Sequence, residues 1–464
     1  MKLTLRPLAL LSASLIAATA SLAEPLTPVD YVSTLVGTDS KFELSTGNTY
    51  PAIAMPWGMN FWTPQTGANG DGWQYSYGAN RIRGFKQTHQ PSPWINDYGC
   101  FSIMPMTGKA ILDQEARGSW FSHKAEDARP YYYKVYLADF DVVVEMAPTE
   151  RACIFRITYP EAKNAAFVVD AIRGEVTAKS ADKILGTSNF NNGGVPENFR
   201  NYFVVESSKP FAVVDKNDQQ IGVVFSTKAR EQVTLKVASS FISHEQAERN
   251  LKELDGKSFD QVVAQGRARW NEVLGRIEIE DANEAHLRTF YSCFYRSVLF
   301  PRGFYEYGAD GKPVHYSPYN GKVLPGYLFT DTGFWDTFRS LFPFVNLLFP
   351  DEAVKMQEGL VNTYLESDFL PEWASPGHRG CMVGNNSASV VADAYIKGIR
   401  GYDAEALWKA VVHGTTNLNH IRLQIFCINT IFAQGLLLGL RFHKCYLRIM
   451  LKWQIDTLIS HLEN

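Results

Sequence analysis

The sequence predicts an α+β multidomain protein, in which an N-terminal antiparallel β-sandwich is followed by a helical linker and a layer of helices. Short runs of β-branched and aromatic residues, separated by Gly, Pro, Asn and Asp, fill residues 30–260. The apolar period then changes from strand-like to helix-like near residue 243. A chain of 464 residues is also too long for one ordinary core, so two or three domains are expected.

The β-rich runs predict the first domain, which we place at residues 24–242. Their spacing and turn residues are typical of an antiparallel β-sandwich. The clearest runs are 131–149, 153–160, 165–171, 201–208, 212–215, 221–227 and 233–242.

Residues 243–279 are expected to form a helical linker, because their apolar residues recur at helical spacing. Beyond the linker, loops containing Gly and Pro separate one helix-like segment from the next. This succession favours an α/α layer over a βαβ sheet, and we place the second domain at 280–417. Its helix-like segments are 286–300, 333–348, 352–365, 386–399 and 404–412.

The first residues, 1–23, have the pattern of an export signal. Lys2 and Arg6 precede an apolar run that ends in small residues up to Ala23. The alternative, a membrane anchor, needs about 20 apolar residues, and Glu24 and Pro25 follow too soon. We therefore expect a secreted or periplasmic protein with no membrane span.

Residues 418–464 differ abruptly in composition from the rest of the chain, since they lack Val and Pro and are rich in Leu and Ile. This shift indicates an unrelated, frameshifted tail. The alternative is a native pair of amphipathic helices. The apolar run 431–440 is too short to span a bilayer.

Charge and cysteine usage exclude several classes of function. The net charge is −3. Removal of the leader would also take away the positive charges of Lys2 and Arg6, so nucleic acid is not an expected partner of the mature chain. Six cysteines lie without CxxC spacing, which argues against a zinc site or a dense disulfide framework. Aromatic residues make up 13% of the chain, which predicts either a large aromatic core or rings that stack on sugars.

Six stretches, in one order along the chain, resemble glycoside hydrolase family 92. They include GDGWQYSYG at 70–78 and GFWDTFR at 333–339. The resemblance extends from about residue 30 to 417. The full set of stretches is 31–40, 49–64, 70–99, 290–302, 326–350 and 383–403.

Members of that family join a β-sandwich to an (α/α)₆ barrel and hydrolyse terminal α-mannosides with inversion, using calcium at the sugar. The resemblance thus implies a secreted, calcium-dependent exo-α-mannosidase that acts on mannose-containing glycans. The helix-like segments suffice for only a partial barrel. In the family, the general acid, the general base and most calcium ligands lie beyond the position of Asn417. We therefore expect a truncated or frameshifted chain that has no catalytic residues and is inactive alone.

The resemblance implies that Asp336 contacts the mannose in the −1 subsite and that Trp335 shapes this subsite. A carboxylate in the first turn of a helix is also favoured by the helix dipole. In the alternative interpretation, Asp336 only caps the helix or pairs with Arg339 at i+3.

The sandwich is expected to contribute Asp71 and Trp73, on a glycine-rich loop, and His89 at the same edge. Trp73 is implied to be a wall of the subsite, with packing between the domains as the alternative. A lone histidine is more often structural than catalytic, so His89 is predicted only as a contact.

Four further carboxylates occur in or near loops of the helical domain: Glu306, Glu366, Asp368 and Glu372. One of them could join a site, but the favoured interpretation is that they are solvated loop charges. Trp373 and His378 belong to a stretch that resembles the family, so they are candidates to line the mouth of the barrel.

Two other classes of function stay open: a non-catalytic carbohydrate-binding module, and a degenerate fragment whose helix faces are left unburied. Reading the coding sequence past codon 417 in the other two frames would distinguish a frameshifted enzyme from these alternatives.

Overall fold

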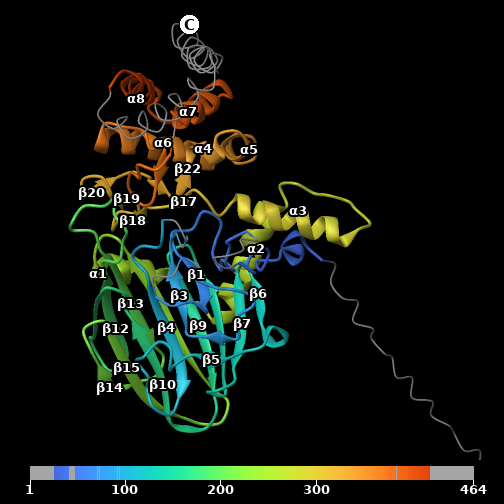
Figure 1. The fold of residues 1–464 in the computed structure, drawn as a ribbon, viewed down its shortest axis with the longest axis vertical. Coiled ribbons are helices and arrows are strands. Elements are labelled where there is room, and N and C mark those ends of the chain that lie inside the picture. The colour runs from blue at the N-terminus through green and yellow to red at the C-terminus, as the bar shows by residue number, and fades with distance from the viewer. Residues whose placement is uncertain are drawn as a thin grey trace, which may run out of the picture.

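The computed structural model describes residues 26–40, 47–69, 72, 74–90, 92, 95–382 and 384–417. The predicted leader, 1–23, and the predicted tail, 418–464, lie outside them. Figure 1 shows two large antiparallel sheets, followed along the chain by helices that gather at one end of the sheets. The predicted fold class is therefore confirmed.

The two sheets of the sandwich have six and eight strands. In spatial order, the six-stranded sheet contains β1 (Phe61–Gln65), β3 (Gly84–Thr88), β4 (Phe101–Thr107), β10 (Ala162–Asp170), β15 (Gln220–Thr227) and β14 (Ala212–Lys216). The eight-stranded sheet contains β11 (Gly174–Ala178), β12 (Lys183–Ser188), β13 (Asn201–Ser207), β16 (Glu231–Ser240), β9 (Ala152–Tyr159), β8 (Val142–Pro148), β7 (Tyr132–Leu137) and β6 (Asp127–Arg129). A two-stranded sheet joins β2 (Arg81–Ile82) to β5 (Ser119–Trp120).

Aromatic side chains from both sheets meet in the core of the sandwich. Trp62 of β1 packs edge-on against Phe155 of β9, with ring centroids 5.6 Å apart. Phe101 of β4 stacks on Phe203 of β13 at 3.9 Å. A Cβ at position 186 would lie 2.2 Å from the Phe203 ring, so Gly186 is required for this close approach. These contacts account for part of the aromatic content as core packing.

The helices follow the sandwich in the predicted order. Their bounds are α1 (His244–Leu251), α2 (Phe259–Leu274), α3 (Glu284–Ser297), α4 (Phe334–Thr337), α5 (Leu341–Leu348), α6 (Pro350–Ser367), α7 (Asn386–Ile396) and α8 (Ala404–Thr416). Three short 3₁₀ segments are η1 (Pro28–Tyr31), η2 (His123–Ala125) and η3 (Lys252–Leu254).

Helix α2 begins at a capping box, in which the Ser258 hydroxyl accepts from the backbone of Gln261. Its Trp270 is completely buried and donates from Nε1 to the carbonyl of Ala54, 2.9 Å away. A Cβ at Gly266 would lie 2.8 Å from that of Tyr131, so the helix packs directly on the sandwich. The linker is thus part of the core of the first domain.

Small sheets connect the sandwich to the helical layer, as Figure 1 shows. They contain β17 (Arg302–Gly303) with β21 (Phe329–Thr330), β18 (Glu306–Tyr307) with β19 (Pro313–Tyr316) and β20 (Val323–Pro325), and β22 (Thr332–Gly333) with β23 (Trp373–Ala374).

The segment 333–348, predicted as one helix, is instead divided into α4 and α5. Ser340 leaves helical geometry, with φ −134° and ψ −51°. Pro343 explains the break, because a continuous helix would need the amide N–H that proline lacks and would bring its ring against the preceding turn.

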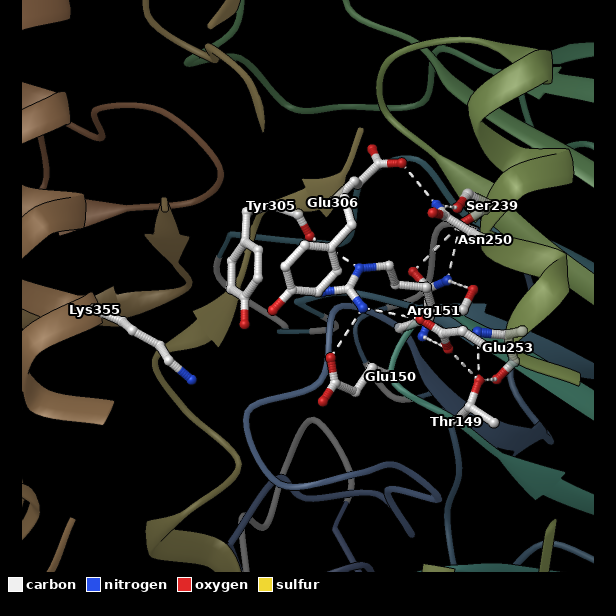
Figure 2. Close-up of polar contacts among 12 residues, drawn as sticks. Thr149, Glu150, Arg151, Ser239, Asn250, Glu253, Tyr305, Glu306 and Lys355 are labelled. Carbon is white, nitrogen blue, oxygen red and sulfur yellow. Dashed lines mark hydrogen bonds and ion pairs between the residues drawn. The ribbon is translucent and has the colours of Figure 1, made fainter. Parts of the chain in front are cut away.

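A buried polar junction around Arg151 fixes the sandwich to the helical part (Figure 2). The Arg151 guanidinium donates to Glu253 of η3 at 2.9 Å and to the carbonyl of Tyr305 at 3.1 Å. Glu306, next to it in β18, accepts from Asn250 of α1 at 2.6 Å. Sandwich, linker and helical part therefore converge on one hydrogen-bonded cluster.

Among the described residues, we find no helix with both the length and the apolar character that crossing a membrane requires.

Candidate functional site

Trp335 and Asp336 lie in the first turn of α4 and face outward. Phe334, the residue before them, is buried and stacks on Phe342 of α5 with centroids 5.5 Å apart. Trp335 is 42% exposed, and Asp336 is also exposed. Phe334 anchors this turn, and an indole ring and a carboxylate stand side by side on its exposed face.

The Asp336 carboxylate has no hydrogen bond or ion pair with any described residue. Arg339 does not neutralise it, because its guanidinium lies over the Trp335 ring at 4.3 Å and donates to the Trp335 carbonyl at 2.8 Å. A Cβ on Gly333 would be 2.7 Å from Asp336 Oδ2, so glycine leaves room for this carboxylate. The predicted alternative, a pair with Arg339, is therefore not formed, and Asp336 can accept hydrogen bonds from a ligand.

Glu372 holds the turn from behind. Its backbone carbonyl accepts from the amide of Phe334 at 2.9 Å, beside the pairing of Gly333 with Trp373. Its carboxylate accepts from the amide of Asn386 at 2.8 Å and from the Ser387 hydroxyl at 2.6 Å, at the start of α7. Burial raises the pKa of Glu372 to about 7 in spite of these bonds.

Asp331, just before β22, is buried and has a left-handed backbone with φ +59°. It is ion-paired with Arg302 and accepts from the Tyr98 hydroxyl at 2.7 Å. Arg302 also donates to the carbonyl of Met59 in the sandwich at 3.1 Å. Burial raises the pKa of Asp331, opposed by the charge of Arg302. This pair couples the start of the site to the sandwich.

Several buried polar atoms near this turn have no hydrogen-bond partner within the described part of the chain. They include Nε of Arg302, Oγ1 of Thr332 and Nδ2 of Asn385. Leaving such a group unpaired typically costs about 1–3 kcal/mol. Unmet polar groups of this kind are expected where water or a polar ligand completes the structure.

His89 is completely buried. Its Nδ1 lies 2.7 Å from the Tyr98 carbonyl, and its ring stacks on that of Tyr98 at 4.9 Å. Burial, together with the charge of Arg302, lowers the pKa of His89 to about 3, so the ring is neutral. We predicted that His89 contacts the sugar, but its side chain has no exposed atom. Its ring stacks on Tyr98 and supports that side chain.

Asp97 forms a second buried ion pair, with Lys86 of β3. Its Oδ2 lies 3.1 Å from Nζ of Lys86, and both side chains are fully buried. Burial opposes ionisation, but Lys86 and the hydrogen bonds of Thr88 and the His89 amide hold the pKa of Asp97 at about 2. Asp71 and Trp73, predicted on the adjoining loop, lie outside the described residues, and their roles stay predictions.

The other four carboxylates are mostly not solvated loop charges, and that prediction was wrong for Glu306 and Glu372, which are buried. Glu306 accepts from the Ser240 hydroxyl and the Phe241 amide as well as from Asn250. Glu366 lies 2.8 Å from His315 Nε2. Only Asp368, which ends α6 in a left-handed conformation, is exposed.

Trp373 and His378 lie near the turn. Trp373 pairs with Gly333 across β22 and β23. His378 contacts the Ser367 hydroxyl at 2.8 Å and the Tyr319 ring at 4.6 Å. Trp373 and Asp336 thus both lie against Gly333, whereas His378 is held by the last residue of α6 and by Tyr319.

Sequence reasoning missed the supporting residues Arg302, Tyr98 and Asp331. All three belong to stretches that carry the family resemblance. Their pairing joins positions more than 200 residues apart, Tyr98 with Asp331, and no local pattern predicts it.

The predicted calcium dependence calls for a cluster of oxygen ligands. No group of three or more His, Cys, Asp or Glu side chains among them lies close enough to hold a metal ion. Calcium prefers six to eight oxygen ligands, and here Asp331 and Glu372 are committed to other partners. Calcium binding therefore stays a prediction, and no step below depends on it.

Two family models match the chain in succession. The glycosyl hydrolase family 92 N-terminal domain matches residues 31–240, and the glycosyl hydrolase family 92 catalytic domain matches residues 246–429. The second match ends inside the segment predicted to be an unrelated tail. A comparison with curated proteins found no match.

Solved structures of mannosidases resemble the chain over most of its length. The inverting mannosidase BT2199 of Bacteroides thetaiotaomicron is 46% identical, with a TM-score of 0.81 over 84% of this chain and 56% of its own. The α-mannosidase BT3965 of the same organism is 29% identical, with a TM-score of 0.76 over 86% and 58%. BT3965 has also been solved in complex with mannoimidazole. The chain thus spans little more than half the length of these structures.

Proposed function

The chain belongs to glycoside hydrolase family 92, and from this premise we propose that its exposed turn at Trp335 and Asp336 binds the terminal sugar of an α-mannoside. The proposed parent activity is that of a secreted, inverting exo-α-mannosidase acting on mannose-containing glycans. We further propose that the chain as given binds this sugar without cleaving it.

The observation that carries the proposal is the unpaired Asp336 carboxylate beside the exposed Trp335 ring. A carboxylate accepts hydrogen bonds from two neighbouring sugar hydroxyls, while an indole packs against the C–H face of the ring. Glu372 fixes the backbone of the turn through Phe334, and Asp331 ties its approach to the sandwich. The two sugar contacts are therefore held in place before a ligand arrives, which reduces the entropic cost of binding.

The proposed lack of hydrolysis rests on the state of the other carboxylates. Inverting hydrolysis needs a general acid and a general base roughly 6.5–9.5 Å apart. Glu306, Glu366 and Glu372 are all engaged by neighbouring side chains or amides. Among the described residues, none of these acids is available beside Asp336 to protonate a leaving group or activate water.

The alternative function is a carbohydrate-binding module that does not derive from a hydrolase, and it would use the same contacts at Asp336 and Trp335. The two functions differ in one expectation: for a hydrolase, the coding sequence past codon 417 in another frame should encode the missing general acid and base, and for a binding module it should not. Export and calcium dependence are parts of the proposal that rest on the family and on the pattern of residues 1–23.

Titration of the purified chain with methyl α-mannoside, followed by calorimetry, tests the binding proposal. Asp336→Ala removes a charged acceptor, and hydrogen bonds to charged groups contribute about 1.5–3 kcal/mol, so we expect affinity to fall roughly 10- to 100-fold. Asp215→Ala, at an exposed position in β14, is the matched control and should leave binding unchanged. Equal affinity in the Asp336→Ala and Asp215→Ala variants would refute the assignment of this turn.

A further inference from the structure

A strongly polar cavity lies in the sandwich, where β10 ends and β15 begins. Its volume is about 450 Å³, within the range of small-molecule sites. All eight residues that line it are asparagine, glutamine or aspartate. Asn69 comes from the loop after β1, Asp113 and Gln114 from the loop after β4, and Asp218 and Gln219 from the turn between β14 and β15.

The walls of this cavity are held by hydrogen bonds among themselves. Asn217 Oδ1 accepts from the amides of Gln219 and Gln220, at 3.0 and 2.8 Å. Gln114 Oε1 accepts from the amide of Asn69 at 2.8 Å. Gln220 Nε2 donates to the carbonyl of Leu112 at 3.0 Å, so the loops after β1 and β4 and the turn between β14 and β15 are joined around the cavity.

Asp170, the last residue of β10, forms the floor and is already neutralised. Its Oδ2 accepts from Arg117 at 2.9 Å, in a pair that is almost completely buried. The same oxygen also accepts from Asn69 Nδ2 at 3.1 Å and from Gln220 Nε2 at 2.9 Å.

Both donors and acceptors are left over for a ligand. Gln114 Nε2 is buried and has no partner within the described part of the chain. Gln219 uses only its Oε1, which accepts from the Arg173 amide at 3.0 Å. Asp218 takes part through its backbone carbonyl, which accepts from the Val176 amide. The side chains of Gln219 and Asp218 can therefore serve a ligand with a donor and an acceptor.

The composition of the cavity decides the class of ligand. No apolar side chain lines it, so it does not suit a hydrophobic molecule. No lysine or arginine lines it, so it does not suit a phosphate or carboxylate. A metal ion is disfavoured because Asp170 is committed to Arg117, and no metal-binding group of acids occurs among the described residues. A neutral molecule rich in hydroxyls meets none of these objections.

We propose that this cavity is a second carbohydrate site, which binds one neutral sugar residue through hydrogen bonds to amide and carboxylate side chains. Its preference for a neutral polyol follows from the lining alone. The choice of a mannose-containing glycan as the source of that sugar rests on the proposed function. A site on the sandwich would hold a branch of the same glycan away from Asp336.

The test uses the full chain and methyl α-mannoside, with binding read by saturation-transfer NMR. The Asp336→Ala variant removes the first proposed site, and we expect it to retain a weaker saturation transfer. Adding Asp218→Ala and Gln219→Ala should reduce that remaining transfer roughly tenfold. Adding Asp215→Ala instead, outside the cavity lining, is the control and should not change it. Thermal melts of each variant establish that the sandwich is folded.

Loss of all transfer in Asp336→Ala alone, or transfer that survives the two cavity substitutions, would overturn the second site. If only the cavity substitutions reduce transfer and Asp336→Ala has no effect, the second site stands and the proposed function at Asp336 fails. Titration with calcium chloride separates the remaining possibility: calcium binding that depends on Asp218, without sugar binding, would overturn the proposal in favour of a metal site.

Discussion

Glu372 is a buried acid whose protonation couples the stability of the folded chain to pH. Burial raises its pKa from 4.5 to about 7, so the folded chain keeps a proton that the unfolded chain releases between these values. Its contribution to stability is therefore fully present below pH 4.5 and is lost as pH rises through about 7. At 1.36 kcal/mol per pKa unit, the whole effect is about 3 kcal/mol.

We expect Glu372→Gln to remove this pH dependence, because glutamine can accept from the Asn386 amide and stays neutral. Urea unfolding at pH 5 and pH 8 measures the free energy of unfolding of the variant and of the wild type. Relative to the wild type, the variant should be more stable at pH 8 than at pH 5. Glu405→Gln, at an exposed position of α8, is the control. Parallel pH profiles for wild type and Glu372→Gln would contradict the assignment.

Arg302 is the partner that makes a buried Asp331 tolerable. Removing one member of a buried ion pair typically costs about 3–5 kcal/mol, because the other charge is left without compensation. Arg302→Met should therefore destabilise the chain by about this amount in urea unfolding. The double variant Arg302→Met/Asp331→Asn should recover part of the loss, since asparagine is neutral and tolerates the left-handed backbone at this position. A double variant no more stable than Arg302→Met would mean that the charge of Asp331 is not the cause.

At the level of single residues, the family resemblance singled out Trp335 and Asp336 but not the residues that support them. The structure shows that both side chains are exposed, while their roles at a sugar stay predictions. Glu306 and Glu372 were misassigned as solvated, because the hydrogen bonds that make their burial possible come from residues distant in sequence. His89 was predicted as a contact at the edge of the subsite, whereas its ring is completely buried and stacks on Tyr98, which only the tertiary structure reveals.

Among the elements, α2 is the one whose role differs most from its description as a linker. Trp270 is completely buried against the sandwich, and large-to-small changes at such aromatic positions cost about 3–5 kcal/mol. Trp270→Ala should therefore lower the urea midpoint strongly. Trp335→Ala makes the same chemical change at a half-exposed position and should change stability by only about 0.5 kcal/mol. Equal effects of the two substitutions would show that α2 is not part of the core of the sandwich.

The elements themselves were largely predictable from sequence periodicity. The β-rich runs coincide with strands β7 to β10 and β13 to β16, and the helix-like segments with α1 to α8. The exception is the segment 333–348, where continuous apolar spacing hid the break between α4 and α5. Pro343 was the available signal for that break. The break leaves Trp335 and Asp336 on a separate short helix, α4.

For the whole molecule, the order of sandwich, helical segment and helical layer was predictable from the change in the period of the apolar residues. Several large apolar side chains on the helices are exposed: Leu347 of α5, Leu365 of α6, Ile396 of α7 and Val412 of α8. Such positions in a helical layer are expected to face further helices.

The central claim is that this chain binds a terminal α-mannoside at Asp336 without hydrolysing it. The most direct measurement is proton NMR of an aryl α-mannoside mixed with the purified chain in the presence of calcium, which reports binding and cleavage in the same sample. We predict saturation transfer to the mannose ring that weakens in Asp336→Ala, with no new anomeric signal of free mannose. Calcium-dependent appearance of β-mannose, the first product of an inverting cleavage, would contradict the account and would place the general acid and base within this chain.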